Sequence, residues 1–408
     1  MAIVKQELQN LIAQQTPRSQ SKTQAPVKRR RFLVVLVSTV ATCAITTYLM
    51  QNPNLLDVLF AHPFSGTTPV LSPAHLVPEQ ATILSRSLYT YHGHKGTVTA
   101  VAWSPDDKKI ASSGTLDSSV QVWDAYTGKL VLISHSHEKD LAIFATTLNR
   151  VDALAWSPDS TQIAAALGND TVGVWSIEKV DKKLFPFTTM TGISNALAWS
   201  PDRSMIAVVT WNIFVQVCSA TTGKLSDTYP GNTKAVLTLA WSPDGKHIAS
   251  GGADGTVQVW SATTGQSSLT YSGHFASVYA VSWSPDSKQI ASGGADGTVQ
   301  VWDAATGRTL FTYRGHVGAV NSVAWQKGPL LPAGIEAYIA SGGADATVQV
   351  WSFGMIGDTK NLLAMALQGE FLIYRGHSGP VTSVTWAPDG QHIASGSEDG
   401  TVQVWQAM

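Results

Sequence analysis

The residues best suited to chemistry in this 408-residue chain are histidines, serines and aspartates that recur together. These three residue types form the triad of many hydrolases, in which the histidine activates the serine hydroxyl. Here similar sets occur several times along the chain, for example His274, Ser292 and Asp296. Repeated near-copies of one constellation indicate architecture rather than a single catalytic centre. We therefore expect no catalytic residues, no cofactor and no enzymatic activity.

A second chemical candidate is the stretch His135-Ser136-His137-Glu138. Two histidines on a loop, with no other ligand fixed beside them, make a weak metal site, so we expect no bound metal. The sequence also contains no nucleophile elbow, zinc-protease, P-loop or calcium-loop motif. We keep His135 and His137 as candidate partner-binding residues.

Length and composition restrict the class of protein further. The chain is longer than one hydrophobic core usually supports, which predicts either two domains or a repeat array. Charged residues make up 13% and hydrophobic residues 44%, a balance that excludes a disordered chain. With 27 basic and 28 acidic side chains the net charge is -1, so we expect no binding to nucleic acid.

The N-terminal segment has the charge pattern of a membrane anchor. Residues 1–31 carry seven Lys or Arg side chains against the single acid Glu7, which gives +6. Phe32 to Met50 is a run of 19 uncharged residues, long enough to cross a bilayer core as a helix. Residues 51–80 carry two acids and no Lys or Arg, so the positive-inside rule places the N-terminus in the cytoplasm.

Two other interpretations of this segment stay open. Arg29 to Leu33 is similar to a twin-arginine export pattern, which would make the segment a cleaved signal. Val40 to Cys43 has a weak likeness to a lipoprotein cleavage box, which would make it a lipid attachment site. All three interpretations export the rest of the chain. Residues 51–80 contain five prolines and no sustained period, as expected of an extended linker.

From residue 87 onward the chain repeats with a basic unit of about 42 residues. One tryptophan series usually precedes a Ser-Pro-Asp turn, and a second ends the pattern VxVW, with Cys218 in that slot of the third unit. The thirteen residues 248–260 are identical to residues 290–302. The first series comprises Trp103, Trp156, Trp199, Trp241, Trp283, Trp325 and Trp386.

Each unit predicts four short strands separated by turns. In the fourth unit, 236–241 alternates in polarity, Ser-Pro-Asp-Gly forms a turn, and 247–252 is the next strand. Asp254-Gly255 predicts a hairpin into the VxVW strand, and a last strand precedes the next Gly-His pair. A single four-stranded sheet cannot bury both of its apolar faces. A ring of such sheets can, because each sheet covers its neighbours.

With these motifs the chain resembles the WD-repeat β-propeller family, over about residues 87–408. The resemblance implies an all-β, seven-bladed propeller of four-stranded antiparallel blades, of a bacterial and membrane-anchored type. It also implies a buried tetrad in each blade, formed by the His of the Gly-His loop, a Ser or Thr, a hairpin Asp and the strand-end Trp. The matching residues are His94, Asp117 and Trp123; His274, Ser292, Asp296 and Trp302; His316, Ser341, Asp345 and Trp351; and His377, Ser395, Asp399 and Trp405.

Several units depart from this tetrad pattern. In the first unit the hydroxyl is Ser112 or Ser113, because one residue is inserted. The fourth unit has Asn232 in place of the histidine. The second and third units keep so little of the pattern that we expect them to depend on packing alone. At the tetrad positions the second unit has Thr147, Ala165, Asp170 and Trp175, and the third has Met190, Val208, Asn212 and Cys218.

Closure of the ring requires a strand from the N-terminal side of the repeats. The chain ends three residues after Trp405, so the seventh blade lacks its outermost strand. Residues 88–91 match the last strand of the other units, and we expect them to complete this blade. The predicted organisation is a cytoplasmic tail (1–31), a transmembrane helix (32–50), a Pro-rich linker (51–80) and the propeller (81–408).

The function that the resemblance implies is a non-catalytic platform that binds unknown protein partners outside the cytoplasm. Candidate partner-binding residues are Trp211 and Phe214 on the third unit's hairpin, with His135 and His137 in the first insertion. The alternative is an extracytoplasmic enzyme or small-ligand sensor that uses the central channel. A cluster of ionisable side chains in the channel mouth would favour that alternative, whereas Ala253, Ala295 and Ala344 before the hairpin aspartates favour the platform.

Overall fold

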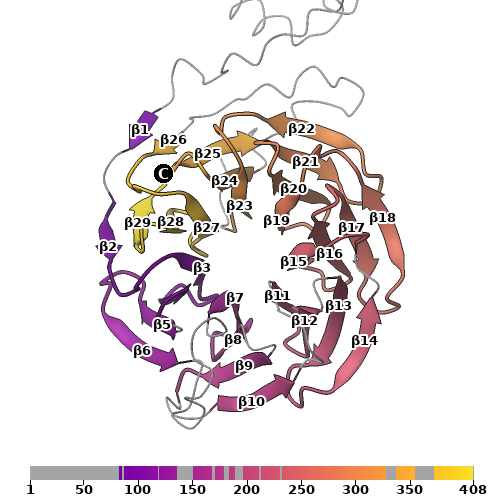
Figure 1. Ribbon diagram of the computed structural model, residues 1–408, viewed down its shortest axis with the longest axis horizontal. Helices are drawn as coiled ribbons and strands as arrows, with labels where there is room; N and C mark the ends of the chain where they lie inside the picture. The colour runs from indigo at the N-terminus through magenta and orange to yellow at the C-terminus, as the bar shows by residue number, and fades with distance from the viewer. Residues whose placement is uncertain are drawn as a thin grey trace, which may run out of the picture. The chain divides into compact units, whose positions relative to one another are not determined.

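The computed structural model divides the chain into two units, Met1–Ser72 and Pro73–Met408. It describes only residues of the second unit: 82–84, 87–117, 119–135, 150–167, 171–178, 183–188, 196–210, 213–229, 232–327, 337–353 and 372–407. The predicted tail, membrane helix and linker (1–80) lie outside these residues. The described residues of the second unit form strands in seven sheets, and the predicted seven-bladed propeller is confirmed (Figure 1).

Blades 1 to 4 each contain four consecutive antiparallel strands, from the innermost to the outermost. Blade 1 has β3 (Val98–Trp103), β4 (Lys109–Gly114), β5 (Ser119–Asp124) and β6 (Leu130–His135). Blade 2 has β7 (Val151–Trp156), β8 (Gln162–Leu167), β9 (Thr171–Ser176) and β10 (Lys183–Thr188). Blade 3 has β11 (Leu197–Trp199), β12 (Met205–Thr210), β13 (Phe214–Ser219) and β14 (Leu225–Tyr229). Blade 4 has β15 (Val236–Trp241), β16 (His247–Gly252), β17 (Val257–Ser261) and β18 (Ser267–Tyr271).

Blades 5 to 7 follow the same plan, but blades 6 and 7 also receive strands from the start of the domain. Blade 5 has β19 (Val278–Trp283), β20 (Gln289–Gly294), β21 (Val299–Asp303) and β22 (Thr309–Tyr313). Blade 6 has β23 (Val320–Trp325), β24 (Ala337–Gly343), β25 (Val348–Phe353), β26 (Leu372–Tyr374) and, outside them, β1 (Thr82–Leu84). Blade 7 has β27 (Val381–Trp386), β28 (His392–Ser397), β29 (Val402–Gln406) and β2 (Tyr89–Tyr91).

The predicted closure of the ring is confirmed. β2 pairs antiparallel with β29 and supplies the outermost strand of blade 7. The closing strand also contacts blade 1, because the ring of Tyr91 stacks on Trp123 with 4.9 Å between their centroids. β1 was not foreseen: it pairs with β26 in parallel and gives blade 6 a fifth strand (Figure 1). Blades 6 and 7, the last two along the chain, therefore each include a strand that precedes the first repeat in the sequence.

The hydrophobic core is divided into seven clusters, and each cluster combines residues of two neighbouring blades. In one of them Ala249 of blade 4 packs with Trp302 of blade 5, both fully buried. Burial of an aromatic side chain of this size stabilises the fold by about 2 kcal/mol or more. No blade could retain this core alone, because each cluster is completed by residues of the next blade.

The first tryptophan series joins the blades to one another. Four of these indoles donate their N–H to a backbone carbonyl in the preceding blade, at 3.0 to 3.2 Å. The pairs are Trp156 with Ala102, Trp283 with Ala240, Trp325 with Ser282 and Trp386 with Ala324. The Ser-Pro-Asp turns after these tryptophans are locally stabilised: Ser242 donates to Asp244 at 2.6 Å, and Gly245 takes a left-handed φ of 73°.

Candidate functional site

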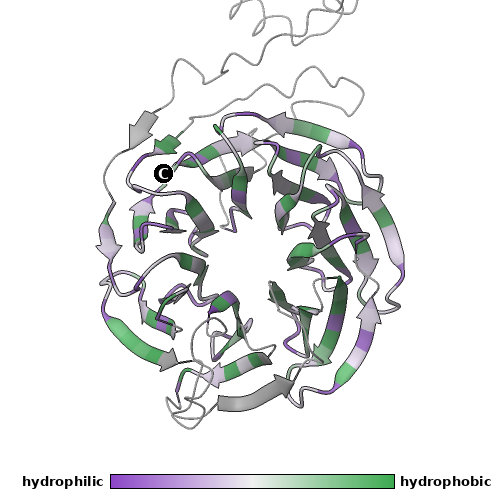
Figure 2. Ribbon diagram, in the orientation of Figure 1, coloured by the Kyte–Doolittle hydropathy of each residue, from purple (hydrophilic) through white to green (hydrophobic). Residues whose placement is uncertain are grey.

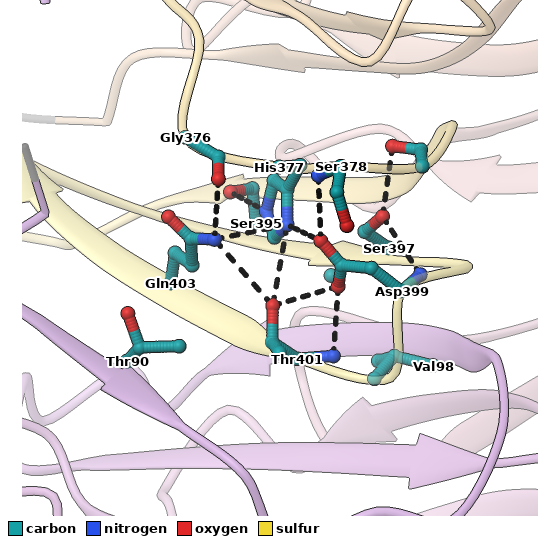
Figure 3. Close-up of polar contacts among 12 residues, drawn as sticks. Thr90, Val98, Gly376, His377, Ser378, Ser395, Ser397, Asp399, Thr401 and Gln403 are labelled. Carbon is teal, nitrogen blue, oxygen red and sulfur yellow. Dashed lines mark hydrogen bonds and ion pairs between the residues drawn. The ribbon is translucent and has the colours of Figure 1, made fainter. Parts of the chain in front are cut away.

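Three of the predicted tetrad residues of blade 7, His377, Ser395 and Asp399, lie together in one hydrogen-bond network (Figure 3). His377 contacts Asp399 through Nδ1 at 2.9 Å and Ser395 through Nε2 at 2.8 Å. The carboxylate of Asp399 also accepts the backbone N–H of Ser378 at 3.0 Å and of Thr401 at 2.9 Å. Because the carboxylate only accepts, the proton of the neutral imidazole lies on Nδ1, and Ser395 donates to Nε2.

The same geometry recurs in blades 1, 5 and 6. The His-to-Asp distances are 2.8 Å for His94–Asp117, 2.9 Å for His274–Asp296 and 3.0 Å for His316–Asp345. The His-to-Ser distances are 2.8 Å for His94–Ser112, His274–Ser292 and His316–Ser341. The ambiguous serine of blade 1 is thus Ser112; the Ser113 side chain bonds Thr99 instead, at 2.8 Å.

The tryptophan takes part in only some of these networks. In blades 1 and 5 the indole N–H of Trp123 and Trp302 donates to the tetrad serine, at 3.3 and 3.1 Å. In blades 6 and 7 the Nε1 atoms of Trp351 and Trp405 have no hydrogen-bond partner among the residues that the structure describes. The His–Asp–Ser part is therefore the constant element of the network.

Burial explains why these sets do not act as hydrolase triads. The side chain of His377 is fully buried and Ser395 is 0% exposed, so a substrate cannot reach the hydroxyl. Burial by itself would raise the pKa of Asp345, but the hydrogen bond from His316, together with those from Val317 and Thr347, helps to lower the pKa to about 2. The stabilisation that follows is fully present above the ordinary carboxyl pKa and is lost as the pH falls towards 2.

Blade 4 replaces the histidine without losing the network. Ser250 donates to the Asn232 side chain at 2.8 Å and accepts from the Trp260 indole at 2.9 Å. The Asn232 amide donates to Thr256, and Asp254 accepts from the hydroxyl of Thr233 at 2.6 Å. An amide therefore satisfies the buried serine, and a neighbouring hydroxyl satisfies the aspartate.

Blades 2 and 3 show packing in place of a tetrad, as far as the structure describes them. Val208 and Cys218 belong to the apolar cluster between these blades, and burial raises the pKa of the Cys218 thiol. Ala165 and Trp175 belong to the cluster between blades 1 and 2. The other residues named for these units, Thr147, Asp170, Met190 and Asn212, lie outside the described residues.

Tyrosine–glutamine pairs, which the sequence analysis missed, connect the tetrads to the preceding blades. The tyrosine at the end of an outer strand donates to a glutamine of the next blade, and that glutamine donates to the carbonyl of the Gly-His glycine. Tyr271 bonds Gln300 at 2.5 Å, and Gln300 bonds Gly273 at 3.0 Å. The other pairs are Tyr91–Gln121, Tyr313–Gln349 and Tyr374–Gln403. The repeated Gln of the VQVW motif was the signal that could have revealed them.

The loops that carry the tetrad histidines and the hairpins that carry the aspartates form one face, here called the Gly-His face. The residue after each histidine is held there, because its backbone N–H donates to the hairpin aspartate. In blades 5 and 6 this residue is apolar and exposed: Phe275 is 92% exposed and Val317 is 64% exposed. Leu116, on the hairpin of blade 1, is 76% exposed on the same face.

The predicted partner-binding residues of units one and three are mostly outside the described part of the chain. Trp211 and His137 lie outside it. His135 is described only by its backbone, which pairs with Ser119 at the end of β6. Phe214 is half-buried at the start of β13, where it pairs with Thr210. These four residues stay predictions.

The innermost strands use their polar side chains to join the blades. Thr99 and Thr382 each donate to a backbone carbonyl of the next blade at 2.5 Å, and Asn321 does so at 2.9 Å. Asp152 at the same position forms an ion pair with Arg150. Within the described residues, no group of three or more His, Cys, Asp or Glu side chains is placed to hold a metal ion.

Comparison with known proteins identifies this repeat. The family model of the WD domain, G-beta repeat, matches six segments that together cover more than half of the chain: 85–124, 139–176, 223–261, 265–303, 307–352 and 370–406. The chain belongs to the WD repeat family. The unmatched stretch between 176 and 223 contains most of blade 3, the unit that had lost nearly all of the tetrad pattern.

Curated relatives of this WD-repeat chain come from eukaryotes. It is similar to THO complex subunit 3 of Arabidopsis thaliana, with 36% identity over 100 residues, which is 24% of this chain and 30% of the relative. It is also similar to actin-interacting protein 1 of Drosophila melanogaster, with 36% identity over 91 residues, or 22% of this chain and 13% of the relative. WD repeat-containing protein 1 of Xenopus tropicalis is 32% identical over 90 residues, which is again 22% of this chain and 13% of the relative. The chain thus spans less than a third of the length of these relatives, and its predicted bacterial type is not tested.

The predicted membrane helix is likewise not tested. In the part of the chain that the structure describes, no helix has the length and apolar character needed to cross a membrane. Residues 32–50 lie outside that part.

Proposed function

We propose that this protein is a non-catalytic platform on which other proteins assemble, and that the Gly-His face is its binding surface. The observation that carries the proposal is Phe275, which is 92% exposed on a loop held by the hydrogen bond from its backbone N–H to Asp296. A large aromatic side chain fully presented to solvent is the residue type that anchors protein interfaces. The names of the relatives, a complex subunit and an actin-interacting protein, point in the same direction.

The surroundings of Phe275 support the same role. Val317 occupies the equivalent position in the next blade, so two apolar side chains lie on adjacent loops. In the other blades whose loops are described, the position carries Lys95, Thr233 and Ser378. Among the described loops the apolar character is therefore confined to blades 5 and 6, and the fold does not require it.

The double variant Phe275→Ser/Val317→Ser is expected to lose most of the partners that the full-length wild-type chain captures from its native membranes. Loss of two exposed apolar anchors typically costs an interface several kcal/mol, which lowers affinity at least about a hundredfold. The measurement is affinity capture followed by quantitative mass spectrometry. The control is Leu225→Ser, which removes a 42% exposed leucine from the outer strand β14. Equal recovery by wild type and the double variant would contradict the proposed surface.

We further propose that the chain is anchored by residues 32–50, with the propeller outside the cytoplasm. The charge difference of +6 before the apolar run against -2 after it supports this orientation. Protease added to intact cells is then expected to degrade the propeller while a cytoplasmic marker protein stays intact. Protection of the propeller until the cells are lysed would contradict the orientation.

A further inference from the structure

Blade 1 ends in an unusually aliphatic outer strand. β6 has the sequence Leu-Val-Leu-Ile-Ser-His, and its edge is not paired with any described strand. Leu130, Val131 and Ile133 are 41%, 48% and 42% exposed, whereas Leu132 points into the cluster between blades 1 and 2. Figure 2 shows β6 as a mainly hydrophobic stretch on the rim. Such an edge offers free backbone groups and apolar side chains to an added strand.

The repeat itself provides the comparison that makes β6 exceptional. In each blade considered, one outer-strand residue lies opposite the glutamine of the third strand. In four blades it is threonine: Thr90, Thr228, Thr270 and Thr312. It is isoleucine only in blades 1 and 6, as Ile133 opposite Gln121 and Ile373 opposite Gln349. Blade 2 has glycine in place of the glutamine, Gly173, and lies outside this comparison.

In blade 6 the isoleucine is covered. β1 pairs in parallel with β26 and places Ile83 beside Ile373, which is only 6% exposed. The equivalent Ile133 of blade 1 is 42% exposed. The same residue type in the same slot is thus nearly buried in the blade that has a fifth strand, and 42% exposed in the blade where no described strand pairs with the outer edge.

Outer strands of several other blades carry features that oppose strand addition. β14 presents Asp227 on its edge, and β10 contains Pro186, which has no backbone N–H to donate. β18 and β22 begin with polar residues, Ser267 and Thr309. β6 has neither charge nor proline over Leu130–Ser134.

We propose that β6 is a docking edge that takes an extended, aliphatic segment of a partner protein as the fifth strand of blade 1. The chemistry of the occupant follows from β1, whose Thr-Ile-Leu sequence covers the equivalent strand of blade 6. Backbone hydrogen bonds would supply affinity, and contacts with Val131 and Ile133 would select β-branched and aliphatic side chains.

The test uses the full-length chain and a synthetic peptide with the sequence of residues 80–86, QATILSR. We expect saturable binding and slower amide hydrogen exchange along β6. The variant Val131→Ser/Ile133→Thr, which introduces residue types found in the other outer strands, should weaken binding at least about tenfold. Leu225→Ser should bind like wild type, and a peptide with aspartate in place of its isoleucine and leucine should not bind.

Three results would overturn the proposal. One is the absence of saturable binding up to about 1 mM peptide, an affinity below that of weak complexes. Another is protection confined to β26, which would mean that the peptide only replaces β1. The third is a dimer in sedimentation experiments that Val131→Ser/Ile133→Thr dissociates, because the occupant would then be a second copy.

The inference rests on the proposed role in protein binding but uses a different surface. Phe275→Ser/Val317→Ser is expected to leave peptide binding at β6 unchanged. Failure of the Gly-His face and failure of the β6 edge can therefore be told apart.

Discussion

Deletion of residues 81–92 is expected to lower the melting temperature by about 10 °C or more. The deletion removes β1 and β2, so blade 7 loses its outermost strand and blade 6 loses its fifth. Tyr91 would no longer stack on Trp123 or donate to Gln121, a hydrogen bond of 2.7 Å. Tyr89, which packs edge-on against Trp123 and bonds the carbonyl of Ala125, would be lost as well.

The size of this effect follows from what the two tyrosines bury. Each is partly buried and contributes up to about 1.5–3 kcal/mol through burial, and the unpaired edge of β29 adds to the loss. A total of about 5 kcal/mol corresponds to about 10 °C in a domain of this class. The measurement is differential scanning calorimetry on the full-length chain and the deletion variant.

A shorter deletion separates the two strands. Removing residues 81–86 takes away β1 and leaves β2, so the ring stays closed and the melting temperature should fall by much less. Equal melting of wild type and the 81–92 variant would show that closure does not depend on β2. Equal losses in the two deletions would assign the stabilisation to β1 instead.

Replacing His377 by leucine is expected to destabilise the propeller by about 3–5 kcal/mol, whereas asparagine should cost only about 1 kcal/mol. Leucine leaves Asp399, whose side chain is 9% exposed, without its main hydrogen-bond donor. It also leaves the buried hydroxyl of Ser395 without an acceptor. Asparagine keeps that contact, as Asn232 does with Ser250 in blade 4.

Blade 4 also shows how the aspartate can be satisfied without histidine. Asp254 accepts from the hydroxyl of Thr233, the residue that follows Asn232. Ser378 follows His377 at the equivalent position and already donates its backbone N–H to Asp399. Its hydroxyl is therefore available to replace the imidazole when position 377 is asparagine.

Urea unfolding of both variants measures these differences. The control is the double variant His377→Leu/Asp399→Leu. It removes the buried charge that the single variant leaves without a partner, so it should recover part of the lost stability. Equal destabilisation by leucine and asparagine would mean that packing of the imidazole, rather than its hydrogen bonds, holds the loop.

Local repetition explains how much of this fold could be predicted. The strands 236–241 and 247–252 are observed where the pattern places them, and the tetrad distances are nearly the same in four blades. Each unit contains its own turn and hairpin signals, so one unit predicts the next. The closure by residues 88–91 could be inferred because the seventh unit itself supplies only three of the four strands of its blade.

What the sequence determined by itself is therefore the repeating unit, the number of blades and the closing strand, because these depend on local patterns and on counting. Tertiary structure alone decided that Ser112 and not Ser113 meets His94, since adjacent strand residues face opposite sides. It also decided that the Asn232 side chain accepts from Ser250, that Tyr271 reaches Gln300 of the next blade, and that β1 pairs with β26 while no described strand pairs with the edge of β6. Each of these depends on which side chains meet across strands or blades. A sequence motif such as the Gln of VQVW marks one partner of such a contact and does not identify the other.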